Sequence, residues 1–584
     1  MAGVTEYFEV HARDGPARRG ELRLVDPLAT PALADDVLVD GGSLWPADRA
    51  VPEGDPGRLT VLPHRGFPAG TRAEVQTTFA ADVPDVGYPS AAVVTPETAA
   101  AHPADASVLS TATGVVGHAE RVLDAVLAVR RATPPDTALY LPGVATPRNA
   151  AVLAYAGVDL FDAKRARVRG RQGRYLTAEG EYDLDALDAL PAPFPSDPPR
   201  AEFDRDDAVA HNVAALESEL ATVRARVAAG RLRDYVEGQA RHENWLTALL
   251  RRLDDEWGYV ERRTPVYRSS PMAAATEDTL RRAEIRRFAD RVSSRYRPRF
   301  DDLPLVLVPC SARKPYSESR SHAAFHRAID YRGHVVSVTS PIGAVPQELE
   351  LVYPAQHYDT VVTGRWTAGE REFVTDLLGR YLDRADYPRV VAHVPDDYRP
   401  VVEDALDGRR LPVAWTVDDH PTDDDSLAAL SEALAGEDRY RKRERQGRTL
   451  RALADYQFGD GAGDDLFGDD LAVEGRYPKL VAREAGEQVA AVVPQYGSLA
   501  FTLGGAERAR DRGVVARVGI GDFVPHGSVL APGVVDADDG VRVGDEVVVE
   551  GPRAFAVGRA AMSGAEMAGS TRGVAVDVRH GEER

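Results

Sequence analysis

Cysteine is almost absent from this 584-residue chain, which contains only Cys310. A single thiol excludes an intrachain disulfide framework and a zinc site built from clustered cysteines. No run of about 18 apolar residues occurs, so the sequence predicts no transmembrane helix. The first residues also lack the basic and apolar regions of a secretory signal. These absences indicate a soluble, cytoplasmic protein without a membrane partner.

Lysine is nearly as scarce. The 71 basic residues include only four lysines, Lys164, Lys314, Lys442 and Lys479, and 92 acidic residues leave a formal net charge of −21. An acidic surface poor in lysine keeps a protein dispersed in concentrated salt and is typical of a halophilic archaeon. In such salt, counterion release contributes little to nucleic-acid binding, and local arginine contacts must provide it. The net charge therefore does not exclude RNA as a partner.

The patterning of the chain predicts several domains, in keeping with its length. Strand-like runs alternate with helical patterns over residues 1–190, which predicts an α/β domain with a parallel sheet, open or closed into a barrel. Residues 205–300 are predicted to form a helical connector. A second α/β domain is predicted over 301–440. An acidic, glycine-rich linker over 458–475 then precedes a small β-barrel over 476–584.

The densest polar chemistry follows the apolar run Leu305–Val308, which is typical of a buried parallel strand. Ligand sites in α/β proteins lie at the carboxyl ends of such strands. Cys310 stands at this end, and its thiolate would be favoured by the nearby cation of Lys314 or by a following helix N-terminus. The pattern therefore predicts a nucleophilic cysteine.

The same segment also has plainer interpretations. Cys310 alone would more often be an inert, buried side chain, and Lys314-Pro315 would more often be a turn. His322 is a candidate proton shuttle and Tyr316 a candidate for orienting a substrate, but His322 and His326 would also pack on one helix face. Cys310, His322 and His326 do not have a recognised zinc spacing, so no metal site is predicted.

The spacing PC-x3-KPY-x2-S-x2-H resembles the hallmark of the archaeosine synthases, which are paralogues of the archaeal tRNA-guanine transglycosylases. Here it is carried by Pro309, Cys310, Lys314, Pro315, Tyr316, Ser319 and His322. The resemblance covers most of the chain. It implies that the catalytic residues are Cys310, Lys314, Tyr316, Ser319 and His322.

The N-terminal domain is similar to the transglycosylase barrel, through Leu141–Arg148 and Gly157–Asp162. Asp162 falls where the transglycosylases carry their nucleophilic aspartate. The zinc cysteines and the Thr-Asp-Ser-Gly motif of that family are absent from this chain. The resemblance therefore implies a catalytically degenerate, TIM-like barrel that still holds tRNA or a deazaguanine, with Asp162 as a weak candidate for the pocket and a stronger one for a structural residue.

The C-terminal barrel resembles a PUA domain, the RNA-binding module of many tRNA-modifying enzymes. The matching segments are Gly527–Val534, Gly544–Val547 and Ala556–Ala560. Glycine permits tight turns and a close approach of the backbone to RNA. The predicted RNA-binding glycines are Gly527, Gly533 and Gly544.

Basic residues cluster in two further places. Residues 164–174 contain six cations, which predicts RNA contact because a local excess of positive charge is unexpected on an acidic protein. The RNA-binding candidates in this segment are Lys164, Arg165, Arg167 and Arg169. Four arginines over 224–233 indicate RNA contact or a solvated face equally well.

The resemblance implies a reaction as well as a fold. An archaeosine synthase adds a nitrogen nucleophile across the nitrile of 7-cyano-7-deazaguanine in the D-loop of tRNA. Glutamine, ammonia or the side chain of free lysine is the expected nitrogen donor and co-substrate. The chain is thus expected to be an amidine-forming, tRNA-modifying transferase. No cofactor and no zinc site are expected.

Two other functions remain open from the sequence. One is a non-catalytic, tRNA-binding paralogue of the transglycosylases, and the other is a transglycosylase of altered specificity that uses Asp162. The cysteine cluster of a radical-SAM enzyme is absent, so any radical step after formation of a lysine adduct would need a partner protein. The sequence leaves open whether the chain forms a homodimer.

Overall fold

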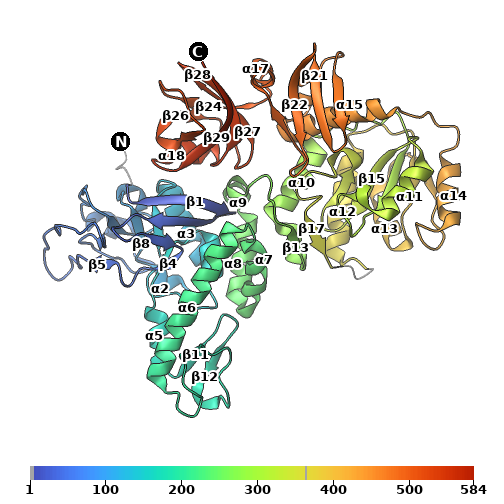
Figure 1. Cartoon of the computed structure of the whole chain (residues 1–584). Coiled ribbons are helices and arrows are strands. Elements are labelled where there is room, and N and C mark those ends of the chain that lie inside the picture. Colours follow the sequence, from blue (N-terminus) through green and yellow to red (C-terminus); the bar gives the residue numbers. More distant parts are fainter. Residues whose placement is uncertain (1–5, 362–364) are drawn as a thin grey trace. The chain divides into compact units, whose positions relative to one another are not determined.

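The computed structural model describes residues 6–361 and 365–584, which form two compact units (Figure 1). The first unit comprises residues 6–265, 530–534 and 562–575, and the second comprises the other described residues. The predicted domains 1–190 and 301–440 include residues 1–5 and 362–364, which lie outside the described residues. No helix in the described ranges is long and apolar enough to cross a membrane.

The first unit is built on a seven-stranded sheet in the order β4-β10-β9-β8-β7-β6-β5. Every pairing in it is parallel, as the alternation of strands and helices predicts. The strands are β4 (Ala32–Leu33), β5 (Leu38–Asp40), β6 (Leu59–Val61), β7 (Ser90–Val94), β8 (Ala106–Leu109), β9 (Ala138–Tyr140) and β10 (Leu160–Phe161). Within the described residues β4 and β5 are its edges and do not pair. The predicted TIM-like barrel is therefore an open half-barrel.

Short elements complete this unit. An antiparallel sheet of β1 (Phe8–Asp14), β2 (Ala17–Leu22) and β3 (Leu28–Thr30) adds Phe8 and Leu22 to the core of the half-barrel. Its helices include α1 (Ala73–Thr78), α2 (Ala112–Val115), α3 (Ala119–Ala132), α4 (Ala150–Ala156) and α5 (Lys164–Arg171). A hairpin of β11 (Arg174–Leu176) and β12 (Glu181–Asp183) follows α5.

The helical region predicted over 205–300 is divided between the two units. The first unit contains α6 (Arg205–Ala228), α7 (Leu232–Gln239), α8 (Asn244–Asp255) and α9 (Trp257–Arg263). Helix α6 begins in a capping box between Asp204 and Asp207. Helix α10 (Ala283–Ser294) belongs to the second unit, because its apolar face enters that unit's core. The structure therefore divides the predicted helical connector between the two units.

The second unit contains a five-stranded sheet in the order β16-β15-β14-β18-β19. The strands are β14 (Leu305–Pro309), β15 (His334–Thr339), β16 (Gly343–Pro346), β18 (Val390–Ala392) and β19 (Val413–Trp415). All pairings are parallel except that of β16 with β15. A separate parallel pair consists of β13 (Met272–Ala274) and β17 (Tyr358–Thr360).

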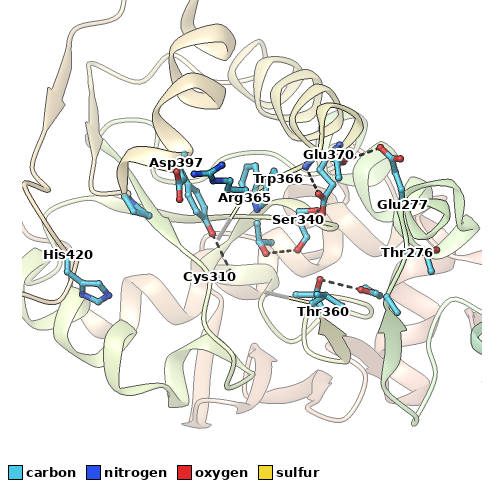
Figure 2. Close-up of a pocket in the computed structure, with 17 residues that line it drawn as sticks. Thr276, Glu277, Cys310, Ser340, Thr360, Arg365, Trp366, Glu370, Asp397 and His420 are labelled. Carbon is cyan, nitrogen blue, oxygen red and sulfur yellow. Dashed lines mark hydrogen bonds between the residues drawn. The ribbon is translucent and has the colours of Figure 1, made fainter. Parts of the chain in front are cut away.

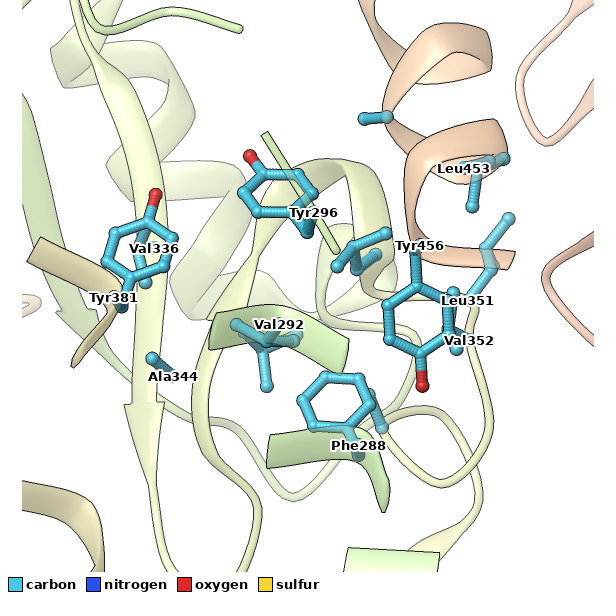
Figure 3. Packing of buried hydrophobic residues seen from close by; sticks show 14 of the residues in the cluster. Phe288, Val292, Tyr296, Val336, Ala344, Leu351, Val352, Tyr381, Leu453 and Tyr456 are labelled. Carbon is cyan, nitrogen blue, oxygen red and sulfur yellow. The ribbon is translucent and has the colours of Figure 1, made fainter. Parts of the chain in front are cut away.

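Alternate residues of β14 explain how helices cover both faces of this sheet. Leu305 and Leu307 enter the larger core with α10, α12 (Ala368–Leu382) and α13 (Arg399–Leu406). Figure 3 shows part of that core, in which Phe288 and Val292 lie among buried side chains of the sheet and later helices. Val306 and Val308 instead pack with α11 (Arg320–Ile329) and α14 (Asp424–Ala433). A strand buried on both faces is uniformly apolar, which is why the sequence reveals it.

The C-terminal region differs from the prediction of a linker followed by one barrel. Residues 458–475 contain α16 (Ala462–Leu466) and the start of β20 (Ala472–Arg476). Leu466 is fully buried, and Asp455 of α15 (Lys442–Phe458) accepts a hydrogen bond from the Gly463 N–H at 2.8 Å. The burial of Leu466 and the hydrogen bond of Gly463 show that this segment packs against the fold and is not a free linker.

Residues 476–584 likewise form two sheets. The first is an antiparallel sheet of β20, β21 (Lys479–Glu484), β22 (Glu487–Val493) and β23 (Ser498–Phe501), beside α17 (Leu503–Asp511). The second has the order β25-β29-β28-β27-β24-β26. Its strands are β24 (Ala516–Ile520), β25 (Ser528–Leu530), β26 (Val534–Ala537), β27 (Glu546–Gly551), β28 (Ala554–Ala560) and β29 (Val574–Glu583).

Candidate active site

The strand order of the second unit places Cys310 at a topological switch point. Strand β14 is the first strand of this sheet in the chain. Strands β15 and β16 lie on one side of it, and β18 and β19 lie on the other. The order therefore reverses between β14 and β18, and a crevice opens at the carboxyl ends of strands where such a reversal occurs. Cys310 directly follows β14, and Tyr398 follows β18 in the short helix Asp396–Tyr398.

A cavity of about 530 Å³ occupies this position (Figure 2). Its walls come from the ends of β13, β14, β15, β17 and β18, from the start of α12, and from the loop after β19. Its polar and aromatic lining residues include Glu277, Cys310, Thr339, Ser340, Trp366, Glu370, Asp397 and Tyr398. A volume of this size is sufficient for a nucleobase and a small co-substrate.

Cys310 shares the cavity with a hydroxyl group that lies outside the sequence motif. The Cys310 Sγ lies 3.9 Å from the Tyr398 hydroxyl oxygen, and the two residues are 88 positions apart. Burial, reinforced by Cys310, raises the pKa of Tyr398. The Trp366 ring packs on Tyr398 with its centroid 4.4 Å away. Tyr398 is therefore held as a neutral phenol beside the thiol.

Lys314 and Tyr316 join a buried polar chain behind Cys310. The Lys314 Nζ lies 3.8 Å from the centroid of the Tyr358 ring. Burial lowers the pKa of Lys314, and the charges of Cys310 and Asp359 oppose that shift, so the ammonium lies within electrostatic range of the cysteine. The Tyr358 hydroxyl bonds those of Tyr316 at 2.8 Å and Thr339 at 2.9 Å. The Tyr316 hydroxyl is thus bonded to Tyr358, and Tyr316 does not line the cavity.

Ser319 and His322 hold the cysteine loop in place. The Ser319 hydroxyl caps α11 by accepting a hydrogen bond from the His322 N–H at 3.1 Å. The His322 Nε2 lies 3.1 Å from the Pro309 carbonyl oxygen, which can only accept, so this nitrogen carries the proton. Burial lowers the pKa of His322 to about 4. Neither residue lines the cavity, and both serve as positioning residues for Cys310.

Another part of the cavity wall is a connected polar network. The Ser340 hydroxyl donates to Glu370 Oε1 at 2.6 Å, and Glu370 Oε2 accepts from the Thr367 N–H at 2.8 Å. The Thr367 hydroxyl donates to Glu277 Oε1 at 3.1 Å. Sequence reasoning missed these residues because they are dispersed over the chain. The rule that ligands bind where parallel strands end would have singled out Ser340, which directly follows β15.

Asp162 has no comparable access. Its side chain is buried and accepts hydrogen bonds from the Tyr140 hydroxyl at 2.7 Å and from the Gly143 and Lys164 N–H groups at 3.0 Å. The Lys164 Nζ lies 3.6 Å away. These contacts give the carboxylate a structural role in joining β9, β10 and α5.

The basic segment 164–174 has acidic partners within the first unit. The Arg167–Asp35 ion pair measures 2.6 Å, and the Arg169–Glu181 pair measures 3.6 Å. Arg165 is half-buried, and burial lowers its pKa. In the second arginine group, Arg233 is buried and forms a bidentate pair with Asp254. Ion pairing within the fold therefore accounts for much of both groups.

The predicted RNA-binding glycines are in the C-terminal sheet and its turns. Gly527 is exposed, with a φ of +81° and open space around it. Gly533 ends the short helix Ala531–Gly533. Gly544 has a φ of +94°, and a Cβ atom there would lie 2.7 Å from the Tyr267 ring, so packing alone requires glycine. No group of three or more potential metal ligands is found among the residues that the structure describes.

Comparisons with known proteins agree with this architecture. Residues 98–197 match the family described as queuine tRNA-ribosyltransferase, and residues 448–511 match the patch-forming domain C2 of tRNA-guanine transglycosylase. Residues 513–581 match the PUA domain, so the predicted barrel over 476–584 joins two domains. Residues 285–434, which carry Cys310, match a domain of unknown function (DUF5591). The fold and these matches define a tRNA-modifying enzyme with transglycosylase-like and PUA domains.

Full-length relatives identify the family within that class. The archaeosine synthase of Haloferax volcanii is 58% identical over 586 residues and covers 100% of both chains. The archaeosine synthase subunit alpha of Methanosarcina acetivorans is 40% identical and covers 99% of both. The tRNA-guanine(15) transglycosylase of Methanothermobacter thermautotrophicus is 28% identical over 79% of this chain and 68% of its own. The chain belongs to the archaeosine synthase family.

Proposed function

We propose that this chain is an archaeosine synthase that adds a nitrogen nucleophile to the nitrile of 7-cyano-7-deazaguanine in tRNA, with Cys310 as its covalent catalyst. The observation that carries the proposal is the position of Cys310 in a cavity at the switch point, with the Tyr398 hydroxyl 3.9 Å from its sulfur. The full-length similarity to the Haloferax enzyme supports the overall reaction. The geometry of the cavity supports the division of roles among its residues.

The first step forms a thioimidate. The Cys310 thiolate attacks the nitrile carbon, so that a C–S bond forms while one π bond of the nitrile breaks and its electron pair moves to nitrogen. Tyr398 donates its proton to that nitrogen. Because burial raises the pKa of Tyr398, its hydroxyl enters the reaction protonated. The ammonium of Lys314 stabilises the thiolate before attack.

The second step releases the product. The amine of the donor attacks the thioimidate carbon, the C–S bond breaks, and the thiolate leaves with the bonding electron pair. The amine gives up one proton, which returns to Tyr398. The net change is addition of N–H across the nitrile to give an amidine, without an oxidant or a reductant. Ammonia as donor gives archaeosine directly. Glutamine would first be hydrolysed to glutamate, which uses one water, breaks the amide C–N bond and supplies the ammonia.

The donor is glutamine, ammonia or the side chain of free lysine. The acidic side chains of Glu277, Glu370 and Asp397 line the cavity and are suited to hold the cationic part of a donor. A lysine adduct would need cleavage by a second protein, for which we propose a radical-SAM partner. The Methanosarcina relative is named as a subunit alpha. The acidic, lysine-poor composition supports a cytoplasm of high salt as the working medium.

The test is mass spectrometry of nucleosides from tRNA that carries 7-cyano-7-deazaguanine. The tRNA is incubated in concentrated KCl with the protein and each donor in turn. We expect a mass increase equal to one ammonia with glutamine or ammonia, or to one lysine with lysine, and no increase with Cys310→Ala. Turnover by Cys310→Ser at the wild-type rate would exclude the covalent route and favour direct attack by the amine. An unchanged nitrile with every donor, despite tight tRNA binding, would favour the non-catalytic paralogue.

A further inference from the structure

A basic surface on α11 and on the start of α15 has no role in the proposed reaction. It consists of Arg320 and Arg327 on α11 and of Arg441, Lys442 and Arg443 at the start of α15. All five side chains are exposed, and none forms an ion pair with an acidic residue in the described ranges. Lys442 is also one of only four lysines in the chain. We call this set the α11/α15 surface.

The end of α11 lies close to the start of α15. The Tyr440 N–H donates to the Tyr331 carbonyl oxygen at 3.1 Å, just beyond the end of α11. The Tyr331 and Tyr440 rings meet edge to face, with 5.3 Å between their centroids. Further along α15, Arg445 adds to burial in lowering the pKa of His326 on α11 to about 3. These contacts therefore place the start of α15 close to the end of α11 in space.

Arg320 and Arg327 point the same way along α11. Residues seven positions apart on an α-helix share one face, and they lie about 10 Å apart along its axis. Helix α11 is also fixed to the cysteine loop, because His322 hydrogen-bonds the carbonyl of Pro309, which precedes Cys310. Arg320 and Arg327 thus lie on the same helix that positions the nucleophile.

The stability of the fold does not explain these charges. Lys442 and Arg443 occupy the first turn of α15, where the helix dipole favours anions and opposes cations. The acidic residue in that turn, Glu444, is paired with Arg448 at 2.5 Å. The cations of segment 164–174, by contrast, have acidic partners nearby. Unpaired cations that helix electrostatics disfavours, on a chain of net charge −21, point to an anionic ligand.

We propose that the α11/α15 surface binds the phosphate backbone of tRNA. The proposal rests on the proposed function for the identity of the RNA. Arginine is suited to this contact because its guanidinium group bonds phosphate oxygens in a bidentate manner. Contacts of this kind orient an RNA without reading its sequence. The surface would hold the backbone while the modified base enters the Cys310 cavity.

The test is tRNA affinity in a charge-neutralised variant. Arg441→Gln, Lys442→Gln and Arg443→Gln are combined, and the Kd for nitrile-bearing tRNA is measured over a series of KCl concentrations at which circular dichroism shows folded protein. We expect binding on the order of 10- to 100-fold weaker, and a shallower dependence of log Kd on log [KCl], by about 0.7 to 0.9 for each phosphate group that the variant no longer binds.

A control variant changes the same number of exposed arginines elsewhere in the second unit. Arg371→Gln, Arg380→Gln and Arg410→Gln alter exposed residues of α12 and of the turn after α13, and should leave the Kd unchanged. Alkylation of Cys310 at the wild-type rate would show that the cavity of the α11/α15 variant is intact. Wild-type affinity in that variant, or an equal loss in the control, would overturn the proposal; wild-type affinity would direct attention to an acidic protein partner instead.

A failure of the proposed RNA contact can be distinguished from a failure of the proposed amidine-forming reaction. Cys310→Ala should bind tRNA as tightly as the wild type, because the thiol is outside the α11/α15 surface. Should the wild type form no amidine with any donor, weaker binding by the α11/α15 variant would still support the RNA contact. Amidine formation with unaltered binding in that variant would retain the chemistry and reject the surface.

Discussion

At the scale of single residues, the site depends on a thiol and a phenol that come from distant loops. Cys310 follows β14 and Tyr398 follows β18, and the adjacent pairing of these two strands brings the side chains together. The motif predicts His322 as a proton shuttle and Tyr316 as a residue that orients the substrate. In the structure the Tyr316 hydroxyl bonds Tyr358, and the Nε2 proton of His322 is directed to a carbonyl oxygen. Tyr398 is a cavity hydroxyl that lies beside the Cys310 sulfur, which is why we propose it as the proton donor.

Tyr398→Phe tests this assignment. Removing the phenol proton should slow amidine formation by roughly 100-fold or more, the contribution typical of a general acid, while tRNA affinity stays at the wild-type value. Single-turnover kinetics followed by nucleoside mass spectrometry gives the rate. Tyr456→Phe is the matched control, because Tyr456 is buried in the core away from the cavity. A wild-type rate in Tyr398→Phe would leave the imidate nitrogen to be protonated by another group.

At the scale of elements, α11 and β14 together form the support of Cys310. Ser319 caps the helix, and His322 joins its first turn to the end of the strand. The neutral form of His322 suits this contact because its buried ring has little access to water. Protonation would place a charge in a buried site, and the resulting loss of stability should be measurable.

The stability of the unit should therefore depend on pH through His322. Burial lowers the pKa of His322 to about 4, against 6.5 for an ordinary histidine, so between these values the unfolded chain binds more protons than the folded one. Unfolding free energy then rises with pH in this window, and acidification from pH 6.5 to 5 should remove about 1.5 kcal/mol. His322→Gln retains a donor for Pro309 but does not titrate. Urea unfolding should show a smaller pH dependence in this variant, and an identical dependence would exclude His322 as its source.

The elements also show which features a sequence can reveal. Strand β14 is predictable because burial on both faces makes it uniformly apolar, and the motif after it is contiguous. Ser340 is predictable from its position directly after β15, but Glu277 and Glu370 are not, because they are far apart in the sequence and meet only in the fold. The acidic composition of residues 458–475 predicts a linker, whereas the structure has α16 and the start of β20 there. Burial of Leu466 and Phe467 orders the segment, and composition does not reveal such contacts.

At the scale of the whole molecule, the two units differ in their relation to the transglycosylase class. The first unit matches that class over residues 98–197, but its sheet is open and its Asp162 is buried in a hydrogen-bond network. The cavity with a cysteine and a neutral phenol lies in the second unit. Sequence resemblance alone points to the segments around both Asp162 and Cys310. Only the contacts of Asp162 and Cys310 show which of the two side chains is available for chemistry.

Asp162→Ala tests this division of roles in the complete chain. The substitution leaves the Tyr140 hydroxyl and the N–H groups of Gly143 and Lys164 without their acceptor, which should cost about 2 to 4 kcal/mol of stability in the first unit. Urea unfolding followed by circular dichroism should therefore show an earlier transition. Amidine formation per folded molecule should be unchanged, because Asp162 is not part of the Cys310 cavity. Exchange of labelled guanine into tRNA by the wild type, abolished in Asp162→Ala, would instead make Asp162 a nucleophile and the protein a transglycosylase.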